Sequence, residues 1–382
     1  MPAAYIRGTG LSCTLGLDAE ACATAMRSGK ASPEQLIVDG FAEPLRLPYY
    51  RIPDGAGSFD PARFQALLQQ VVRQVLARAG LSSAERRTLP VFVGSSCFSI
   101  GSSEAGYTQA LVRDARNAIP MPFCGYQGIA SAVQHALGSR GDTYNYNTAC
   151  TSSANALLAA LRMLAVGEYP QALVVGAELA NRTTLAGFHG LQLTAERVQP
   201  FDARRQGLVL GEGVGAVLLS AQPGSTGELR LLGGANNCDG WSVVTANPDG
   251  KSVAAVLRAS LDNAGLHAAQ VCGIKAHGTA TPAGDTAEAL GLRQVFEELP
   301  PLSVLKPYLG HTLGACGVNE LVLYAGALQQ GFLPATPGFE VPDPQLEVHP
   351  LRTEASAEPG HYLLNHFGFG GNNTVLVLEK PA

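Results

Sequence analysis

The chain has 382 residues, of which 46% are hydrophobic and 15% are charged, and its formal net charge at pH 7 is −5. This composition supplies enough apolar material for a large core and argues against intrinsic disorder. No basic cluster indicates a nucleic-acid partner, and no apolar run approaches the roughly 20 residues that a membrane helix needs.

Short apolar runs alternate along the chain with longer segments of helical periodicity. In chain order the sequence predicts helix 64–80, strands 89–94 and 143–147, helix 151–165, strands 172–178 and 214–220, helix 253–265, and strands 271–278 and 374–379. Most of the strand candidates are runs of Val, Leu and Ala without polar alternation, which favours strands covered on both faces. Gly80 and Gly265 follow their helices, where glycine accepts a left-handed conformation. We therefore expect an α/β fold in which helices flank buried sheets.

One segment is the best candidate for a joint between two halves. The stretch AQPGSTGE, residues 221–228, is rich in turn-forming residues but is too short to be a free linker. We accordingly place an N-terminal half at residues 1–225 and a C-terminal half at residues 226–382.

The cysteines and the beginning of the chain bear on its compartment. Cysteines stand at positions 13, 22, 97, 124, 150, 238, 272 and 316, and no two of them have C-x-x-C spacing. We therefore expect neither a zinc site nor a redox dithiol. The opening MPAAYIRGTGLSCTLG lacks the regions of a signal peptide. Scattered single cysteines in such a chain are typical of reduced thiols, so we expect a soluble, cytoplasmic protein.

Cys150 stands where predicted strand 143–147 runs into predicted helix 151–165. At the entrance of a helix, unpaired backbone N–H groups and the helix dipole favour an anion. Such a position is expected to lower the pKa of a thiol below its free value of about 8.5. The small residues around Cys150 leave room for a substrate, so it is a candidate nucleophile. The alternative is a buried cysteine that fills apolar space.

His277 lies in a glycine-rich segment. The strand CGIKA delivers it to a loop, KAHGTATPAGDTAEALGL. Asp285, with Glu288 three residues later, indicates a capping box that opens the next helix and fixes this loop. A fixed loop is what a catalytic group requires, although a single histidine is also compatible with a surface or core role.

His311 lies in another such segment, SVLKPYLGHTLGACGVNELVLYAGAL. Gly314, Ala315 and Gly317 give the following helix a face of small residues, which allows a neighbouring backbone to approach closely. Lys306 precedes His311 by five residues. A solvated surface lysine is the alternative interpretation of Lys306.

The last segment of interest is the glycine-rich turn in NHFGFGGNNTVLVLEK. Gly368, Gly370 and Gly371 precede strand 374–379 and can let backbone N–H groups point into a cavity, as an oxyanion hole requires. Ordinary tight turns use the same residues, so this signal alone does not identify a site.

Six segments, taken together, resemble the β-ketoacyl-ACP synthases, the condensing enzymes of the thiolase-like superfamily, in their type I/II elongating branch. In chain order they are IRGTGLSCTLG, GIASAVQHALGSRGDTYNYNTACTSSANAL, PFDARRQGLVLGEGVGAVLL, AHGTATPAGDTAE, KPYLGHTLGACGVNE and NHFGFGGNN. An ordered set of motifs is far less accidental than any one of them. The resemblance implies a thiolase-like fold of five layers, αβαβα, with two similar halves, which is usually dimeric.

Carried over residue by residue, the resemblance implies that Cys150 is the nucleophile. It implies that His277 and His311 are the catalytic histidine pair, that Lys306 is the active-site lysine, and that Glu320 is the supporting glutamate of the following helix.

The same resemblance implies the parts that receive the substrate. The backbone amides of Cys150 and Phe369 match the oxyanion hole, and Phe369 also matches a gating phenylalanine. Thr279 and Thr281 match threonines that line the phosphopantetheine channel.

The implied activity is that of an acyltransferase. An acyl group on Cys150 undergoes decarboxylative Claisen condensation with malonyl-ACP, and the two histidines must present N–H donors to the thioester oxygen. Acyl carrier protein is the implied partner, and the dimer is either a homodimer or a heterodimer with a related ketosynthase-like subunit. No metal or redox cofactor is expected, because the substrates arrive as thioesters on phosphopantetheine.

Several positions depart from the family pattern. Gln206, Leu208, His366 and Asn372 replace residues that are usually Asp, Phe, a small residue and Thr. The chain is also short between GSSCFSIG and MPFCGYQG, which shapes the acyl pocket and the dimer contact. Together with LPYYRIPD (47–54), this favours a specialised polyketide or aryl-polyene pathway over fatty-acid synthesis.

Other functions fit the sequence less well. A chain-length-factor subunit usually lacks the nucleophile that this chain retains. A degradative thiolase would need a second cysteine near the C-terminus, and NHFGFGGNN has none. GSSCFSIG does not have the spacing of a serine-hydrolase elbow, and GEGVG lacks a nucleotide-binding context.

Overall fold

The computed structural model describes residues 3–29, 32–60, 62–97, 100–119 and 127–382. The α-helices are α1 (Ala19–Arg27), α2 (Ala62–Ala79), α3 (Ser83–Thr88), α4 (Ile100–Asp114), α5 (Gln127–Leu137), α6 (Ser152–Ala165), α7 (Arg182–Gly190), α8 (Lys251–Ala264), α9 (Pro282–Arg293), α10 (Lys306–Leu309) and α11 (Cys316–Gln329). The short 3₁₀ helices are η1 (Ala268–Gln270), η2 (Leu313–Ala315) and η3 (Phe369–Gly371).

The strands are β1 (Ala4–Cys13), β2 (Glu34–Val38), β3 (Leu45–Tyr50), β4 (Val91–Gly94), β5 (Thr143–Tyr146), β6 (Gln171–Glu178), β7 (Leu210–Gly211), β8 (Gly213–Ser220), β9 (Arg230–Cys238), β10 (Val271–Lys275), β11 (Leu302–Ser303), β12 (Phe332–Leu333), β13 (Ala355–Ser356), β14 (Gly360–Phe367) and β15 (Asn372–Lys380). Each predicted helix and strand is present, with its ends shifted by at most a few residues. Gly80 and Gly265 adopt positive φ angles of 64° and 71°, as their places after α2 and α8 predict.

The largest sheet repeats one plan twice. Within the described residues its strand order is β11-β10-β14-β15-β9-β1-β8-β6-β4-β5. In the N-terminal half, β8 pairs antiparallel with β1 and β6, and β4 pairs parallel with β6 and β5. In the C-terminal half, β15 pairs antiparallel with β9 and β14, and β10 pairs parallel with β14 and β11. The halves join only where Ala4 and Tyr5 of β1 pair with Leu231 and Arg230 of β9. The boundary between residues 225 and 226 stays a prediction.

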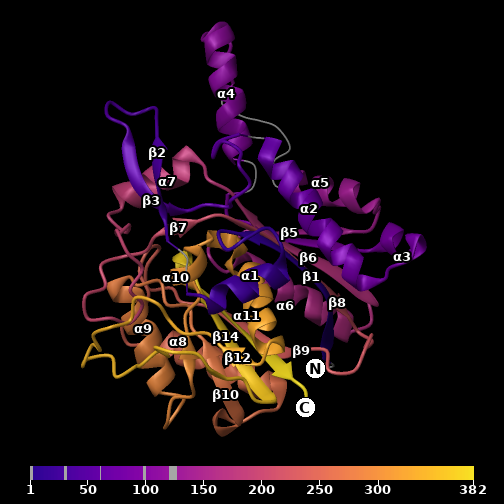
Figure 1. Cartoon of the computed structure of the whole chain (residues 1–382), viewed down its shortest axis with the longest axis vertical. Coiled ribbons are helices and arrows are strands. Elements are labelled where there is room, and N and C mark those ends of the chain that lie inside the picture. The colour runs from indigo at the N-terminus through magenta and orange to yellow at the C-terminus, as the bar shows by residue number, and fades with distance from the viewer. Residues whose placement is uncertain (1–2, 30–31, 61, 98–99, 120–126) are drawn as a thin grey trace.

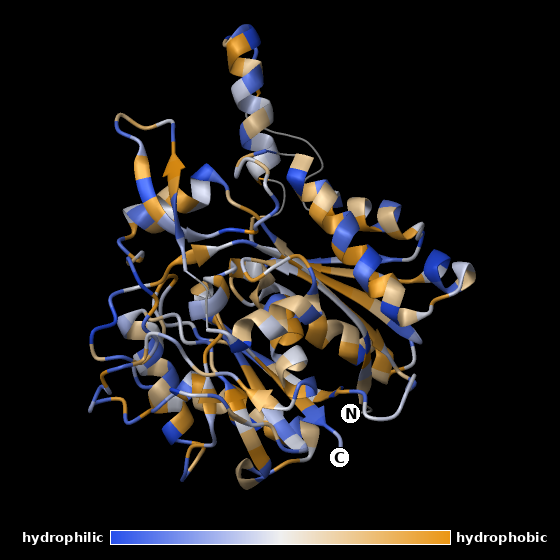
Figure 2. Ribbon diagram, in the orientation of Figure 1, coloured by the Kyte–Doolittle hydropathy of each residue, from blue (hydrophilic) through white to orange (hydrophobic). Residues whose placement is uncertain are grey.

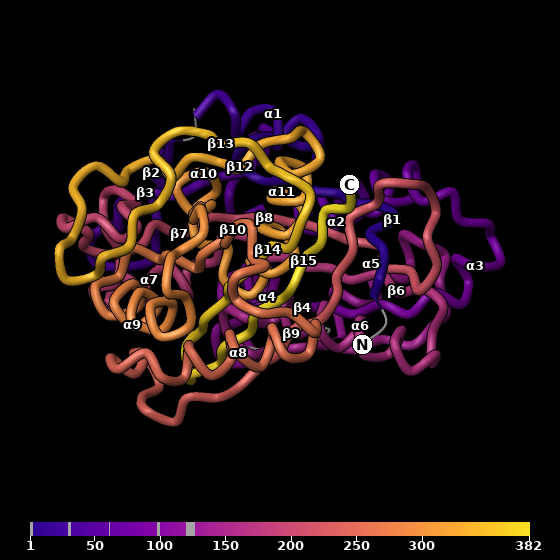
Figure 3. Tube along the Cα trace, turned by 90° about the horizontal axis from the view of Figure 1, so that it is seen from below, coloured from indigo at the N-terminus to yellow at the C-terminus, as the bar shows by residue number. Residues whose placement is uncertain are grey.

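Helices cover and separate these two half-sheets. Helices α6 and α11 pack against each other and against strands of both halves, which makes them the central layer. Helices α2 and α5 cover the outer face of the N-terminal half, and α8 and α9 cover the outer face of the C-terminal half. Figure 3 shows α2, α3 and α5 on one side of the molecule and α9 on the other. The five-layered arrangement expected from the sequence is confirmed.

The central layer brings two helix N-termini into close contact. The side chains between the sheets are apolar and buried, among them Leu157 and Leu161 of α6 and Leu321 of α11. A Cβ at Gly317 would overlap the backbone of Ala154, so only glycine permits the observed approach of α11 to α6. The prediction of a small-residue face is therefore confirmed, and it places the chain before α6 beside the chain before α11.

Part of the N-terminal half extends away from this body. Figure 1 shows α4 projecting from the molecule beyond the hairpin of β2 and β3. No described residue of α4 is buried, and its Val112 is 86% exposed. In Figure 2 the strands of the large sheet are predominantly apolar, whereas α4 carries both apolar and polar residues.

Two further sequence predictions concern membrane-spanning helices and the shortened pocket segment. No helix of the described part of the chain is long and apolar enough to cross a membrane. The shortened pocket segment lies between GSSCFSIG and MPFCGYQG, and residues 98–99 and 120–126, which include Cys124 and parts of both motifs, lie outside the described residues.

Candidate active site

A tight turn between β5 and α6 presents the thiol of Cys150. Ala149 adopts a φ angle of 51°, which is uncommon for a residue other than glycine, and the chain reverses there from strand to helix. Hydrogen bonds hold this turn: the N–H of Thr148 donates to Ser152 Oγ at 3.0 Å, and the hydroxyl of Thr151 donates to the carbonyl of Thr148 at 2.7 Å. The geometry therefore gives Cys150 a fixed position at the start of α6.

Cys150, His277 and His311 meet in one cavity. The Sγ of Cys150 lies 3.1 Å from Nε2 of His311. The rings of His277 and His311 have centroids 5.5 Å apart and are nearly perpendicular, at 84°. The three residues are almost completely buried, since none is more than 5% exposed. The structure thus brings Cys150 together with two histidines that lie more than 100 positions later in the sequence.

Backbone pairing with β7 fixes His311. Its N–H donates to the carbonyl of Val209 at 2.8 Å, and its carbonyl accepts from the N–H of Gly211 at 3.1 Å. A Cβ at Gly211 would overlap the carbonyl oxygen of Leu309, so the glycine lets this strand pass close to α10. Backbone hydrogen bonds to the segment LVLGEG (208–213) therefore hold His311 in place.

His277 is fixed by the carboxylate of Glu288. The N–H groups of His277 and Gly278 each donate to an oxygen of Glu288 at 2.8 Å. The predicted capping box is wrong: α9 begins at Pro282, its N-cap is Thr281, and Asp285 and Glu288 lie within the helix. The physical reason is that both carboxylates instead turn toward the loop, where they accept its backbone N–H groups. The loop is fixed, as expected, but by hydrogen bonds from its backbone to these carboxylates rather than by a capping box.

A buried ion cluster supports the two histidines. Lys306 Nζ lies 3.3 Å from Nδ1 of His277 and 2.8 Å from one oxygen of Glu320. The other oxygen of Glu320 lies 2.5 Å from Nζ of Lys275. One carboxylate thus bridges two lysines, and Lys306 is not the solvated surface lysine of the alternative interpretation.

The charges of this cluster set the protonation of the site. Burial would raise the pKa of Glu320, but Lys275 and Lys306 outweigh it and hold that pKa well below its usual value. Burial, followed by the charge of Lys306, lowers the pKa of His277 strongly and that of His311 to about 3. Both imidazoles are therefore neutral at physiological pH, as N–H donors to a developing oxyanion should be.

Sequence reasoning missed Lys275. It is completely buried in β10, and its Nζ also donates to the carbonyl of Asn365 at 2.6 Å and lies 3.5 Å from Nδ1 of His366. A lysine within the otherwise apolar run CGIKA was the available signal, because such a residue is rarely buried without a partner. His366, identified as a departure from the family pattern, is thereby part of the ion cluster.

The Glu320→Gln variant is expected to be much less stable than the wild type. Its amide leaves Lys275 and Lys306 buried without a countercharge, so the free energy of unfolding should fall by about 3–5 kcal/mol. Chemical denaturation measures this change. The matched control is Glu354→Gln, which removes an exposed pair with Arg27 and should cost no more than about 1 kcal/mol. Equal losses in the two variants would contradict the assigned role of Glu320.

The protonation state of Cys150 differs from the sequence prediction. Burial raises its pKa to about 11, although the backbone amide of Phe369, the charge of Lys306 and its own amide act in the opposite direction. The predicted low pKa is therefore wrong for the free enzyme. At the start of α6, the N–H groups of Thr151 and Ser152 are already bonded to Thr148 and Ala149, so they do not stabilise the thiolate.

The pH dependence of alkylation tests this correction. Because the pKa of Cys150 is raised to about 11, the thiol predominates below that pH. Its labelling by iodoacetamide, followed by peptide mass spectrometry, should therefore rise about tenfold per pH unit from pH 7 to pH 10. A small model thiol, whose pKa is about 8.5, should level off within this range. A plateau for Cys150 below pH 8 would contradict the account.

The glycine-rich turn before β15 places the backbone amide of Phe369 beside the sulfur of Cys150. The amides of Phe369 and Cys150 both favour the thiolate, so both are directed at the position where negative charge develops. Gly370 and Gly371 have φ angles of 72° and 73°, which glycine adopts readily. The ring of Phe369 stacks on Phe188, with centroids 5.6 Å apart.

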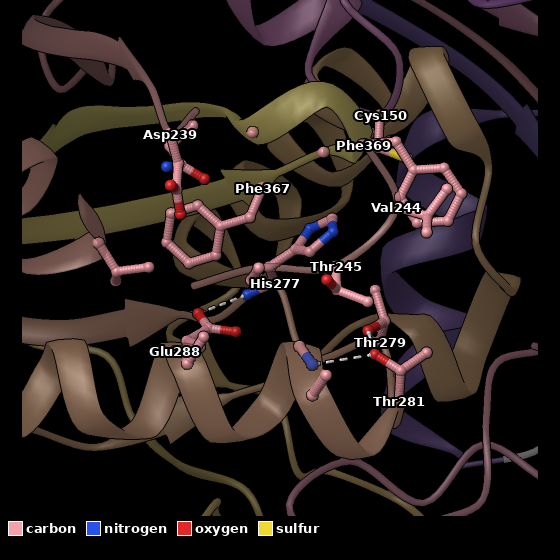
Figure 4. Close-up of a pocket in the computed structure, with 18 of the residues that line it drawn as sticks. Cys150, Asp239, Val244, Thr245, His277, Thr279, Thr281, Glu288, Phe367 and Phe369 are labelled. Atoms are coloured by element: carbon pink, nitrogen blue, oxygen red, sulfur yellow. Dashed lines mark hydrogen bonds between the residues drawn. The ribbon is translucent and has the colours of Figure 1, made fainter. Parts of the chain in front are cut away.

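These groups line a cavity of about 260 Å³. Figure 4 shows the sulfur of Cys150 beside the ring of Phe369, with the imidazole of His277 facing the same space. Thr279 and Thr281 lie on the cavity wall, and their hydroxyl oxygens are 2.9 Å apart. Lys306 and Glu320 lie behind the histidines rather than on the wall. The predicted residues are therefore all in or directly behind this cavity.

The remaining departures from the family pattern differ in how close they lie to the cavity. Leu208 lines the cavity, whereas Gln206 is exposed and Asn372 begins β15. Only Leu208 and His366 thus bear directly on the site. In the described part of the chain, no group of three or more His, Cys, Asp or Glu side chains could hold a metal ion.

Comparisons with known proteins agree with this geometry. Residues 51–223 match the family model "Beta-ketoacyl synthase, N-terminal domain", and residues 230–340 match "Beta-ketoacyl synthase, C-terminal domain". The 3-oxoacyl-[acyl-carrier-protein] synthase 2 of Vibrio harveyi is 29% identical over 81% of this chain and 80% of its own length. Nodulation protein E of a Rhizobium species is 28% identical over 98% of both chains.

Solved structures show the same fold. A ketosynthase from Xenorhabdus doucetiae, solved in complex with its chain length factor, matches 99% of this chain and 98% of its own. The sequences are 26% identical and the TM-score is 0.85. A β-ketoacyl synthase from Burkholderia phymatum is 24% identical, covers both chains completely and has a TM-score of 0.83.

Proposed function

Because this chain belongs to the β-ketoacyl synthase family, we propose that it is a catalytically active β-ketoacyl-[acyl-carrier-protein] synthase with Cys150 as its nucleophile. One observation carries this proposal. The thiol of Cys150 lies 3.1 Å from His311, with His277 in the same cavity and Lys306 directly behind it. A thiol, two neutral imidazoles and two backbone amides around one space suit thioester chemistry.

The first half-reaction is thioester exchange. The sulfur of Cys150 attacks the carbonyl carbon of an acyl-carrier thioester, and the amides of Cys150 and Phe369 stabilise the tetrahedral oxyanion. The C–S bond to the carrier then breaks. The thiol proton of Cys150 finally resides on the released carrier thiol, so no net proton is consumed. Burial of Cys150 makes the deprotonated state transient in this reaction.

The second half-reaction is decarboxylative condensation. A malonyl-carrier thioester loses CO₂, and negative charge develops on its thioester oxygen, where His277 and His311 donate N–H groups. The carbanion attacks the acyl carbon on Cys150, a C–C bond forms, and the C–S bond to Cys150 breaks. One proton restores the thiol, and the carrier holds a β-ketoacyl chain that is two carbons longer. Burial and the charge of Lys306 keep both imidazoles neutral, and Glu320 holds Lys306 in place beside His277.

Acyl carrier protein is the proposed partner, because both substrates are thioesters of a long flexible arm. Thr279 and Thr281 stand on the cavity wall where such an arm would pass.

No metal or redox cofactor enters either half-reaction. The described cysteines are free, which suits a reducing cytoplasm.

We further propose that the chain functions as a dimer with a second ketosynthase-like subunit. No described residue of helix α4 is buried, and its Leu111 and Val112 are 38% and 86% exposed. Exposed apolar residues on a projecting helix are typical of a surface that a partner covers. The relative from Xenorhabdus doucetiae was solved with its chain length factor, which supports a heterodimer. We place this heterodimer in a specialised polyketide or aryl-polyene pathway, as the departures in the pocket segment indicate.

Intact-protein mass spectrometry tests this function. The purified chain is incubated with a panel of acyl-carrier thioesters, alone and with candidate partner subunits. An active synthase acquires one acyl mass on Cys150, and the preferred chain identifies the pathway. A chain that never becomes acylated, under any combination, would instead be a chain-length-factor-type subunit.

A further inference from the structure

A second buried thiol contacts the same imidazole as the nucleophile. The Sγ of Cys316 lies 3.1 Å from Nδ1 of His311, while Nε2 of that ring lies 3.1 Å from Cys150. Cys316 is the first residue of α11, is completely buried and does not reach the cavity wall. The mechanism above assigns no role to it. Its only route to the chemistry is therefore through the His311 ring.

Hydrogen bonds of Asn319 and Thr312 indicate which atom donates in the contact between Cys316 and His311. The amide Nδ2 of Asn319 donates to Thr312 Oγ1 at 3.3 Å, and Thr312 Oγ1 donates to Cys316 Sγ at 3.5 Å. An amide nitrogen can only donate, so Thr312 accepts from Asn319 and its own proton is directed toward the sulfur. The sulfur then has its S–H available for His311. The hydrogen bonds run in one sense, from Asn319 to the imidazole.

The surroundings of Asn319 and Cys316 support this series of hydrogen bonds. An added Cβ at Gly213 or Gly215 of β8 would overlap the amide group of Asn319, so these glycines create its space. Burial raises the pKa of Cys316 well above the ordinary thiol value, which leaves the S–H intact. An intact S–H is a donor, and a buried thiolate would not be.

We propose that Cys316 is a positioning residue that holds His311 in the tautomer with its proton on Nε2. A neutral imidazole has one N–H, and a ring that accepts at Nδ1 must carry that proton on Nε2. Nε2 is the atom that faces Cys150. The donor required at the thioester oxygen is therefore selected by a side chain that never touches the substrate.

The importance of this tautomer rests on the proposed synthase function. With the proton on Nδ1, a lone pair at Nε2 would face the developing oxyanion. Cys316→Ala should therefore reduce the condensation rate by about 10-fold to 100-fold, as removal of residues that orient catalytic ligands does elsewhere. Acylation of Cys150 depends on other donors and should change by less than about threefold, a contrast that loss of folding would not produce.

Nuclear magnetic resonance of the ¹⁵N-histidine-labelled protein, without substrate, tests the tautomer directly. The His311 signal is identified by its absence in His311→Asn. In the wild type and in Cys316→Ser, which retains a hydroxyl donor, the signals should report Nε2–H. In Cys316→Ala the pattern should shift toward Nδ1–H. The control Cys22→Ala removes a buried thiol elsewhere and should leave the His311 signals unchanged.

Three results would overturn the proposal. They are an Nδ1–H pattern in the wild type, an unchanged Nε2–H pattern in Cys316→Ala, and a serine variant that behaves like the alanine variant. The spectra need no activity. An inactive wild type with the Nε2–H pattern would therefore refute the synthase function alone.

Discussion

Replacing Cys150 with alanine is expected to abolish both formation of the acyl-enzyme and elongation. The variant has no described thiol on the cavity wall that can form the covalent thioester, because Cys316 lies behind His311 and does not reach that wall. Loss of the nucleophile should lower the rate of condensation by at least about 10⁴-fold. Intact-protein mass spectrometry measures the acyl adduct, and chromatography of carrier-bound products measures elongation.

Two controls make the result specific to Cys150. Cys272→Ala removes a partly buried thiol of β10 outside the cavity, and this variant should acylate normally. Binding of acyl carrier protein to Cys150→Ala should match the wild type, because the docking surface is unaltered. A normal acyl mass shift in Cys150→Ala would show that another residue carries the acyl group.

Replacing His311 with alanine should separate the two half-reactions. The amides of Cys150 and Phe369 remain, so the variant should still accept an acyl group at a rate within about tenfold of the wild type. Condensation should fall by roughly 10²–10³-fold, because one of the two N–H donors to the thioester oxygen is lost. Single-turnover assays measure acylation and elongation separately.

The control for His311→Ala is His135→Ala. His135 is exposed on α5, far from the cavity in sequence and absent from its wall, so both rates should be unchanged. Full elongation by His311→Ala would exclude a transition-state role for His311. A loss confined to acylation would instead assign it to proton transfer from Cys150.

The sequence predicted those residues whose position depends on local structure. A strand that runs directly into a helix places Cys150, and a glycine-rich turn before a strand places Phe369. The meeting of Cys150 with His277 and His311 followed from the order of the family motifs, which encodes a fold that no local pattern could specify. The structure brings these residues into one cavity from both halves of the chain.

Properties that depend on distant segments could not be predicted. The pKa of Cys150 is raised because loops from the C-terminal half bury it, and this burial outweighs the local helix effect. The Asp285–Glu288 spacing fits a capping box, but the backbone of the loop that begins at His277 bonds to both carboxylates. Local patterns identify the groups available, whereas tertiary contacts decide how they are used.

Residues with ordinary local roles were the hardest to recognise. Lys275 appears in sequence as one polar residue in a strand, and Cys316 as a small residue in a helix. Lys275 acquires its significance from Glu320 on the central helix α11, and Cys316 acquires its significance from the ring of His311, five residues earlier in the chain. Gly213 and Gly215 similarly matter because Asn319 occupies the space beside them.

Reconstitution with defined substrates tests most directly whether this cavity performs condensation. The chain, with any partner subunit it requires, is incubated with an accepted acyl-carrier thioester and a malonyl-carrier thioester labelled with ¹³C at its free carboxyl group. The account predicts one labelled CO₂ for each β-ketoacyl product two carbons longer, with the elongated product lost in Cys150→Ala. Labelled CO₂ and elongated product formed equally by that variant, or an acylated wild type that only hydrolyses its thioester, would contradict it.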